Sequence, residues 1–250
     1  MKKPKFWHTP AGKLYGLYDD ILKQTHTIIA GSTGSGKSVL LNGIIYTALY
    51  KAPSQAQFLL IDLKRVELQL YKNLPHTLRH CTEAGETQQV LNIIIREMMA
   101  RYDRMSEKNL KQSTETPLYI FIDELGDLVT EAPAVTKQLG RIARLGRAAG
   151  IHIIAGTQNP NRKTLSADFL GNCPARVALR CDDPIESRQV IKCPDAVKLP
   201  EHGYALYKSP QIIGAPQLVA VPYIEPDELT ARVKHWTDQK DPPRRRFWQR

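Results

Sequence analysis

The chain has 250 residues and a mass of 28.3 kDa, which suits one large α/β domain or at most two small ones. Hydrophobic residues make up 42% and charged residues 24%, which excludes collagen-like and intrinsically disordered chains. The apolar runs are short, so we expect neither a membrane-spanning helix nor a signal peptide. The formal net charge of +10 is compatible with a nucleic-acid partner, although seven of these charges come from residues 1–5 and 244–250.

The four cysteines, Cys81, Cys173, Cys181 and Cys193, include no Cys-x-x-Cys pair. No local cluster of histidines and cysteines supplies the four ligands of a structural zinc site. We therefore expect reduced thiols and a cytoplasmic location.

Short apolar runs alternate with segments of helical periodicity along most of the chain. This pattern predicts strands at residues 26–30, 57–62, 118–123, 151–157, 175–180, 203–207 and 217–222. It predicts helices at residues 38–50, 83–108 and 132–149, a helix that begins at residues 183–184, and a last one from residue 225 to about residue 236. Strands that alternate with helices indicate an α/β fold, in which helices cover both faces of a mostly parallel sheet. We expect a lead-in at residues 1–24, a main domain at 25–224, and a C-terminal helix with a mobile basic tail at 225–250.

A complete phosphate-binding motif, G-x-x-x-x-G-K-[ST], lies between the first predicted strand and the first predicted helix. Its glycines let backbone N–H groups surround a phosphate, and the helix start adds partial positive charge. Lys37 is placed to reach the β- and γ-phosphates, and Ser38 to offer its hydroxyl to Mg²⁺. We predict that ATP and Mg²⁺ are bound by Gly31, Ser32, Thr33, Gly34, Ser35, Gly36, Lys37 and Ser38.

Two acids, Asp123 and Glu124, follow the apolar run of the third predicted strand. A carboxylate at this point lies beside the phosphate loop, so we expect Asp123 to hold Mg²⁺ and Glu124 to polarise the attacking water. The pair favours an ATPase over a metabolic kinase, and the sequence contains no Asn-Lys-x-Asp motif of a GTPase. The alternative is that both acids only stabilise a helix start.

Gln158 ends the fourth predicted strand, within Gly-Thr-Gln-Asn-Pro at residues 156–160. A polar side chain there can contact the γ-phosphate or the water that attacks it. We expect Gln158 to act as this sensor, with a simple turn as the alternative.

These motifs resemble the motor domain of the FtsK/SpoIIIE DNA translocases, within the FtsK–HerA group of RecA-like ATPases. The most specific match is Arg-Ala-Ala-Gly-Ile-His at residues 147–152, which precedes a strand and the Thr-Gln pair. The matching segments, in the family's order, are residues 27–38, 60–68, 123–128, 143–152, 155–160 and 186–188.

The resemblance implies a homohexameric ring that hydrolyses ATP between subunits and moves duplex DNA through its pore, independently of sequence. It makes Arg188 the candidate that a neighbouring subunit offers to the transition state, with Arg144 and Arg147 as competitors. Asn159 stands where the family has an arginine. Lys64 lies in a segment that matches the family's Asp-Pro-Lys, where it can approach the nucleotide or the pore, or form a salt bridge at the edge of the core.

The sequence also departs from the family. We expect it to lack most of the preceding α subdomain, the membrane region and the winged-helix domain. These departures favour a motor of a mobile element, plasmid or phage over one that segregates chromosomes at a septum. A relaxase or another accessory protein is a candidate partner.

Two polar loops carry basic residues that could hold DNA phosphates in any sequence. The first loop, residues 158–173, contains Arg162 and Lys163, and the second, residues 104–116, contains Arg104, Lys108 and Lys111. We predict DNA contacts at Arg162, Lys163, Lys108 and Lys111, with ordinary solvated loops as the alternative.

Three other functions are open at this point. A transfer motor for conjugation or phage packaging could act on single-stranded DNA. A type VII secretion-like ATPase would move protein, and it would normally carry several ATPase modules and membrane segments. A non-hydrolysing nucleotide switch would have no need for Lys37, Ser38, Asp123 and Glu124, which are all present.

Overall fold

The computed structural model describes residues 16–51 and 56–238. The predicted mobile tail and most of the predicted lead-in lie outside these residues. Within them, no helix combines the length and the apolar character that crossing a membrane would need.

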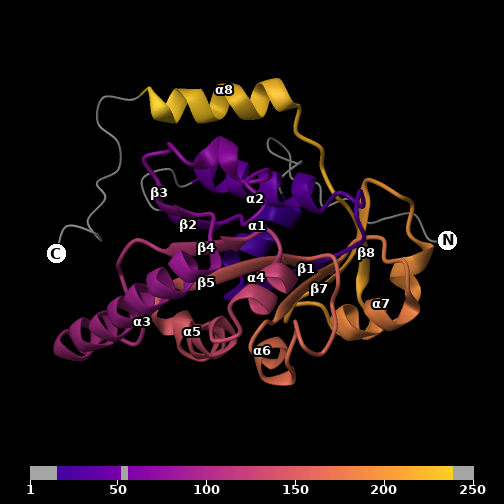
Figure 1. The fold of residues 1–250 in the computed structure, drawn as a ribbon. Coiled ribbons are helices and arrows are strands. Elements are labelled where there is room, and N and C mark those ends of the chain that lie inside the picture. Colours follow the sequence, from indigo (N-terminus) through magenta and orange to yellow (C-terminus); the bar gives the residue numbers. More distant parts are fainter. Residues whose placement is uncertain (1–15, 52–55, 239–250) are drawn as a thin grey trace.

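One sheet of eight strands forms the centre of the described chain, in the order β3-β2-β4-β5-β1-β6-β7-β8 (Figure 1). Strands from β3 to β6 in this order pair in parallel, and β7 and β8 are added antiparallel. The predicted α/β fold with a mostly parallel sheet is therefore confirmed. The strands are β1 (His26–Ala30), β2 (Gln57–Ile61), β3 (Thr77–Cys81), β4 (Leu118–Ile122), β5 (Ile151–Thr157), β6 (Ala175–Ala178), β7 (Tyr204–Lys208) and β8 (Gln217–Ala220).

Helices cover both faces of the sheet (Figure 1). One face carries α1 (Gly16–Lys23), α2 (Lys37–Lys51) and α8 (Pro226–Thr237). The other carries α3 (Ala84–Glu107), α4 (Leu125–Glu131), α5 (Val135–Ala149) and α6 (Ala167–Gly171). The remaining elements are α7 (Pro184–Ile191), which packs against β6 and β7, and the short 3₁₀ turns η3 (Gln69–Tyr71) and η4 (Asp195–Lys198).

The central strands supply two hydrophobic cores because successive strand residues point to opposite faces. Ile28 and Ile120 join the core with α3 and α5, whereas Ile29 and Phe121 join the core with α1 and α2. Parallel strands end at the same edge of the sheet, which brings the segments after β1, β4 and β5 together. This carboxyl-end edge holds the candidate site.

Several elements differ from the sequence prediction. Helix α1 lies within the predicted lead-in, and β3 is an additional edge strand. The helix predicted at residues 132–149 begins at Val135, because Pro133 separates α5 from a distinct α4. The first predicted DNA loop contains the short helix α6.

Candidate nucleotide-binding and catalytic site

The phosphate loop, residues 31–38, turns tightly from β1 into α2. Gly34 and Gly36 have positive φ angles of 80° and 98°, which side-chain-bearing residues rarely adopt. At Gly31, an added Cβ would lie 2.4 Å from the Ser35 Oγ. That Ser35 hydroxyl is buried and has no hydrogen-bond partner among the described residues. The loop thus holds a polar group that only a ligand or solvent would satisfy.

Lys37 is the first residue of α2 and reaches across the sheet to Asp123. Its Nζ donates to the Asp123 carbonyl oxygen at 2.8 Å and to Oδ1 at 2.6 Å, and both side chains are buried. Strand β5 lies between β1 and β4, so the lysine has to cross it. It crosses at Gly156, where an added Cβ would lie 2.4 Å from the Asp123 oxygen and 2.9 Å from the Lys37 Cδ.

Glu124 is held firmly by the end of β5. Its Oε1 accepts from the Thr157 hydroxyl at 2.8 Å and from the Gly126 N–H at 3.1 Å, and its Oε2 accepts from the Gln158 N–H at 2.8 Å. Only 8% of the residue is exposed. Glu124 is also the N-cap of α4. It therefore stabilises a helix start, as the alternative predicted, and it lies in the site as well.

Gln158 connects this carboxylate to the phosphate loop. Its side-chain oxygen accepts from the Thr33 hydroxyl at 2.9 Å, while its backbone N–H donates to Glu124. The chain then enters the loop that carries Arg162 and Lys163, both exposed.

Asn161 shapes this loop. Its Oδ1 accepts from the N–H groups of Lys163 at 2.8 Å and Thr164 at 3.0 Å. These bonds hold the backbone of the loop while its basic side chains stay in solvent.

Lys64 forms a salt bridge with Asp127 at 3.0 Å, on the solvent side of the site. The hydrogen bond to Asp127 raises the pKa of Lys64 against the opposing effect of burial, and the charges of Asp127, Glu124 and Asp123 raise it further. Of the three possibilities for this lysine, the structure shows the salt bridge, which places a positive charge beside the acids.

The oxygen groups of the site suit a hard cation. Asp123 is 3% exposed and Ser38 lies in the first turn of α2, so both offer oxygen near the phosphate loop. Among the residues that the structure describes, no group of three or more acidic, His or Cys side chains could hold a metal ion. A bound Mg²⁺ would therefore need further oxygen ligands from the nucleotide or water.

A hollow of about 430 Å³ adjoins the phosphate loop on the α2 side of β6. Apolar side chains dominate its walls, and His202 and Tyr223 stand at it with substantial exposure. Its lining residues are Gly34, Ser35, Gly36, Val39, Leu179, His202, Gly203, Val221 and Tyr223. The sequence predicted neither this hollow nor the hydrogen bond from Thr157 to Glu124. The Thr-Gln pair at the end of β5 was the available signal for that hydrogen bond.

The structure does not bring the two predicted DNA loops together. Lys108 and Lys111 precede β4, so they lie at the amino-end edge, where the Ser113 N–H donates to the Ala148 oxygen at 2.8 Å. Arg104 is not in a loop at all: it belongs to α3 and pairs with Glu97 and Glu115.

The three candidate trans arginines are exposed. Arg188 lies on α7, and Arg144 and Arg147 lie on α5. None of them forms an ion pair within the described part of the chain.

The strand order and the residues at its carboxyl-end edge define a RecA-like P-loop NTPase. Solved structures share this fold. A cytoplasmic domain of the type VII secretion ATPase EccC from Thermomonospora curvata matches 88% of this chain and 29% of that one, with a TM-score of 0.75 and 22% identity. The pCW3 conjugation coupling protein TcpA, solved with ATPγS, matches 86% and 66%, with a TM-score of 0.73 and 24% identity.

Sequence comparisons give the family. Residues 16–117 match the model of the FtsK/SpoIIIE family. The DNA translocase FtsK of Caldanaerobacter subterraneus subsp. tengcongensis is 36% identical over 229 residues, which cover 86% of this chain and 32% of that protein. FtsK of Chlorobaculum tepidum is 33% identical over 250 residues, which cover 91% and 31%. The chain belongs to the FtsK/SpoIIIE family, and it spans about a third of the length of these relatives.

Proposed function

We propose that the chain is the motor of an ATP-dependent DNA translocase, which hydrolyses ATP between the subunits of a homohexameric ring and moves duplex DNA through its pore. The observation that carries this proposal is the position of Gln158. Its backbone binds Glu124, its side chain binds the phosphate loop, and the loop with Arg162 and Lys163 starts at the next residue. A change at the γ-phosphate would therefore be transmitted directly to a basic loop.

The geometry of the site supports the following hydrolytic roles. Lys37 exchanges Asp123 for the β- and γ-phosphates, and Ser38 and Asp123 would hold Mg²⁺, which neutralises phosphate charge when bound. Glu124 accepts a proton from the attacking water, and Thr157 and Gln158 hold the carboxylate in position through their hydrogen bonds. The apolar hollow beside Gly36 receives the base and ribose.

A complete catalytic site needs a second subunit in this proposal. Arg188 is exposed and unpaired among the described residues, so it is available to neutralise transition-state charge at a neighbour's site. Arg162 and Lys163 contact DNA phosphates in the pore. Lys108 and Lys111, at the other edge of the sheet, would be a separate contact with DNA.

Two alternatives are distinguished by substrate. The relatives named DNA translocase favour a DNA substrate, for which we propose duplex DNA. The structural similarity to a conjugation coupling protein favours the alternative of a transfer motor that acts on single strands, on a plasmid or in a phage. A protein substrate, as for a type VII secretion ATPase, would make hydrolysis indifferent to DNA. We further propose that the motor is encoded by a mobile element and that a relaxase is a candidate partner.

The first experiment measures ATP hydrolysis alone, with long duplex DNA and with single strands. The proposal predicts strong stimulation by duplex that Lys37→Ala and Glu124→Gln both abolish. Stimulation by single strands alone would favour the transfer motor. An assembled protein that hydrolyses ATP equally with and without any DNA would refute the DNA motor.

A mixing experiment tests the trans arginine. Every interface of an Arg188→Ala ring lacks the arginine, and every interface of a Lys37→Ala ring lacks the phosphate-loop lysine. Each variant alone should therefore be inactive. In mixed rings, some interfaces combine the good halves of both, and hydrolysis should return to a fraction of the wild-type rate. If mixed rings form but stay inactive, or if Arg188→Ala turns over normally, Arg188 does not act in trans.

A further inference from the structure

The outward side of α5 carries four basic residues and no acidic one. Lys137, Arg141, Arg144 and Arg147 are exposed, and their spacing of four, three and three residues places them along one side of the helix. None of the four makes an ion pair within the described part of the chain. We call this side the α5 basic face.

Helix electrostatics do not account for the α5 basic face. Like charges three and four residues apart repel each other and destabilise a helix. Arg147 in the last turn is favourable toward the helix dipole, but Lys137 lies in the first turn, where a cation is unfavourable. The arrangement costs stability in the isolated chain, and an external anion would compensate for it.

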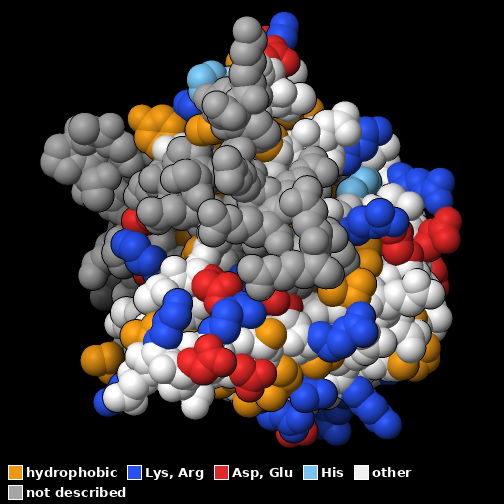
Figure 2. All heavy atoms as spheres, turned by 90° about the vertical axis from the view of Figure 1, so that its left-hand side faces the viewer, with side chains coloured by type: hydrophobic (Ala, Val, Ile, Leu, Met, Phe, Trp, Pro, Cys, Tyr) orange, Lys and Arg blue, Asp and Glu red, His pale blue; other side chains and the backbone are white. Residues whose placement is uncertain are grey.

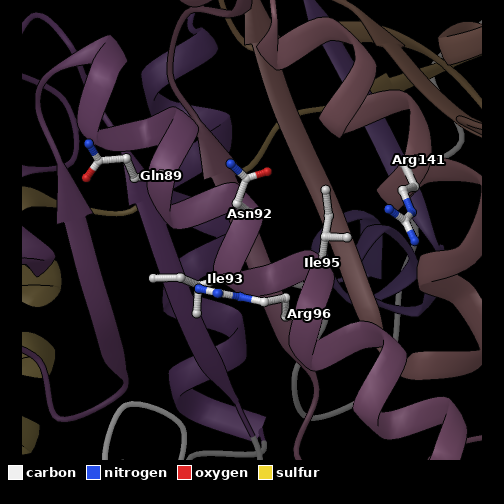
Figure 3. A pocket seen from close by; sticks show the side chains of 6 residues that line it. All are labelled: Gln89, Asn92, Ile93, Ile95, Arg96 and Arg141. Carbon is white, nitrogen blue, oxygen red and sulfur yellow. The ribbon is translucent and has the colours of Figure 1, made fainter.

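A groove between α3 and α5 adds a further cation beside this face (Figure 3). It is an open hollow of about 640 Å³, lined by Gln89, Asn92, Ile93, Ile95, Arg96 and Arg141. Arg96 on α3 and Arg141 on α5 both line it and both are exposed, and the Arg96 side chain extends toward Ile93, away from Arg141 (Figure 3). Glu97, the acid next to Arg96, is already engaged by Arg101 and Arg104.

The positive surface continues beyond the helix. The loop with Lys108 and Lys111 packs on the end of α5 through the bond between Ser113 and Ala148. In the view onto this end of the molecule, Lys and Arg side chains gather at the lower edge, the level at which Figure 1 shows α3 and α5 (Figure 2). The exposed acids of α3, Asp103 and Glu107, only partly offset this charge.

We propose that the α5 basic face, together with Arg96, is a second binding surface for the phosphate backbone of DNA, separate from the loop after Gln158. The proposal rests on the proposed DNA motor function. With a rise of 1.5 Å per residue, the face from Lys137 to Arg147 spans about 15 Å, over which one DNA strand presents about four phosphates. Exposed guanidinium groups from α3 and α5 suit phosphate oxygens, and contacts with phosphates carry no base information, so the contact is independent of sequence.

The test compares two triple variants of the whole chain with equal loss of charge. Lys137→Gln, Arg141→Gln and Arg96→Gln remove three members of the surface and spare the candidate trans arginines. Lys72→Gln, Lys192→Gln and Lys234→Gln remove three exposed lysines from other elements. Binding of a fluorescent duplex is measured over a range of salt concentrations with a non-hydrolysable ATP analogue, after thermal melts confirm that both variants fold.

We expect the α5 variant to bind duplex about tenfold or more weakly at low salt, and the slope of log affinity against log salt to fall by about two to three. The control should keep the wild-type slope. Equal slopes in both variants would overturn the proposal. The proposal would also be overturned if the α5 variant kept the wild-type slope but its assembly mass changed in ultracentrifugation. That result would make the α5 basic face a contact with an acidic surface of a second copy. If the wild type itself fails to bind DNA, the proposed function fails first.

Discussion

The ammonium of Lys37 and the carboxylate of Asp123 form a buried ion pair at 2.6 Å, across strand β5, which lies between β1 and β4. In this arrangement each group neutralises the other before any nucleotide is present. A bound triphosphate would take the lysine, and a cation would take the aspartate. In the proposed function, the ion pair thus holds the ammonium and the carboxylate in position until the nucleotide and the cation bind to them.

Breaking this pair from one side should destabilise the free protein. Lys37→Met leaves Asp123 charged and buried, so we expect a loss of about 3 kcal/mol or more in the free energy of unfolding. Adding Asp123→Asn removes the uncompensated charge and should recover part of that loss. Urea unfolding without nucleotide or Mg²⁺ measures Lys37→Met, Asp123→Asn and the double variant. A double variant that is as unstable as the sum of the two single variants would show that the groups do not depend on each other.

Glu124→Gln should separate binding from hydrolysis. The amide preserves the size of the side chain but cannot accept a proton, so turnover should fall by about 10²- to 10⁴-fold while nucleotide affinity stays within a few-fold. Asp127→Asn, at the nearby acid that pairs with Lys64, is the matched control and should keep near-normal turnover. The two readouts are steady-state hydrolysis and titration with a fluorescent ATP analogue. A Glu124→Gln variant that still turns over would remove Glu124 from the role of base.

Gly156→Ala should damage the site without altering any polar group. The new Cβ would lie 2.4 Å from the Asp123 oxygen, so β4 or β5 has to shift, at a cost of about 1–3 kcal/mol. Nucleotide affinity should fall as well, since the methyl group also lies 2.9 Å from Lys37 Cδ. Gly85→Ala, which meets nothing within 4 Å at the start of α3, should leave both quantities unchanged or raise stability slightly. Chemical unfolding and nucleotide titration of both variants check this, and equal results for the two would contradict it.

Acid should destabilise the protein through His26. Burial and the nearby His152 lower the pKa of His26 from 6.5 to about 3, and its Nδ1 accepts the Ile153 N–H. Between these pH values the unfolded chain binds more protons than the folded one, so this contribution to stability is complete above pH 6.5 and is lost as the pH falls toward 3. The slope reaches at most about 1.4 kcal/mol per pH unit.

The measurement is the free energy of unfolding at several pH values between 7 and 4 for the wild type and for His26→Gln. The variant should show a shallower decline, whatever its stability at neutral pH. His202→Gln, at an exposed histidine, should decline as the wild type does. Parallel curves for wild type and His26→Gln would rule out this source of acid sensitivity. Burial also lowers the pKa of His152, so some decline should persist in the variant.

Sequence reasoning predicted those parts of the molecule that depend on local spacing. The phosphate loop, the two acids and the central strands each have a pattern that is complete within about ten residues, and all lie where the topology requires. The hydrogen bonds of Glu124 to Thr157 and Gln158 join segments 33 and 34 residues apart, so no local pattern contains them. The edge strand β3 was missed because its sequence, Thr-Leu-Arg-His-Cys, has weak strand character.

The positions of Lys108 and Lys111 could have been predicted from chain order alone. A helix that follows the carboxyl end of one parallel strand returns the chain to the amino ends of the sheet before the next strand begins. The loop between α3 and β4 therefore has to lie opposite the phosphate loop. The sequence analysis named both basic loops as DNA contacts without using this constraint to place them at opposite edges of the sheet. The pairing of Arg104 with Glu97 and Glu115 depends on packing.

The hollow beside the phosphate loop is built by a different stretch of chain from the one that carries the acids. Val221 and Tyr223 reach it only because β7 and β8 turn back antiparallel at the end of the sheet, more than 60 residues after Gln158. In the proposed function, the wall that meets the base comes partly from the phosphate loop and partly from residues around β7 and β8, whereas the two acids follow β4. Substitutions at Val221 and Tyr223 should therefore change how the base is held while leaving Asp123 and Glu124 in place.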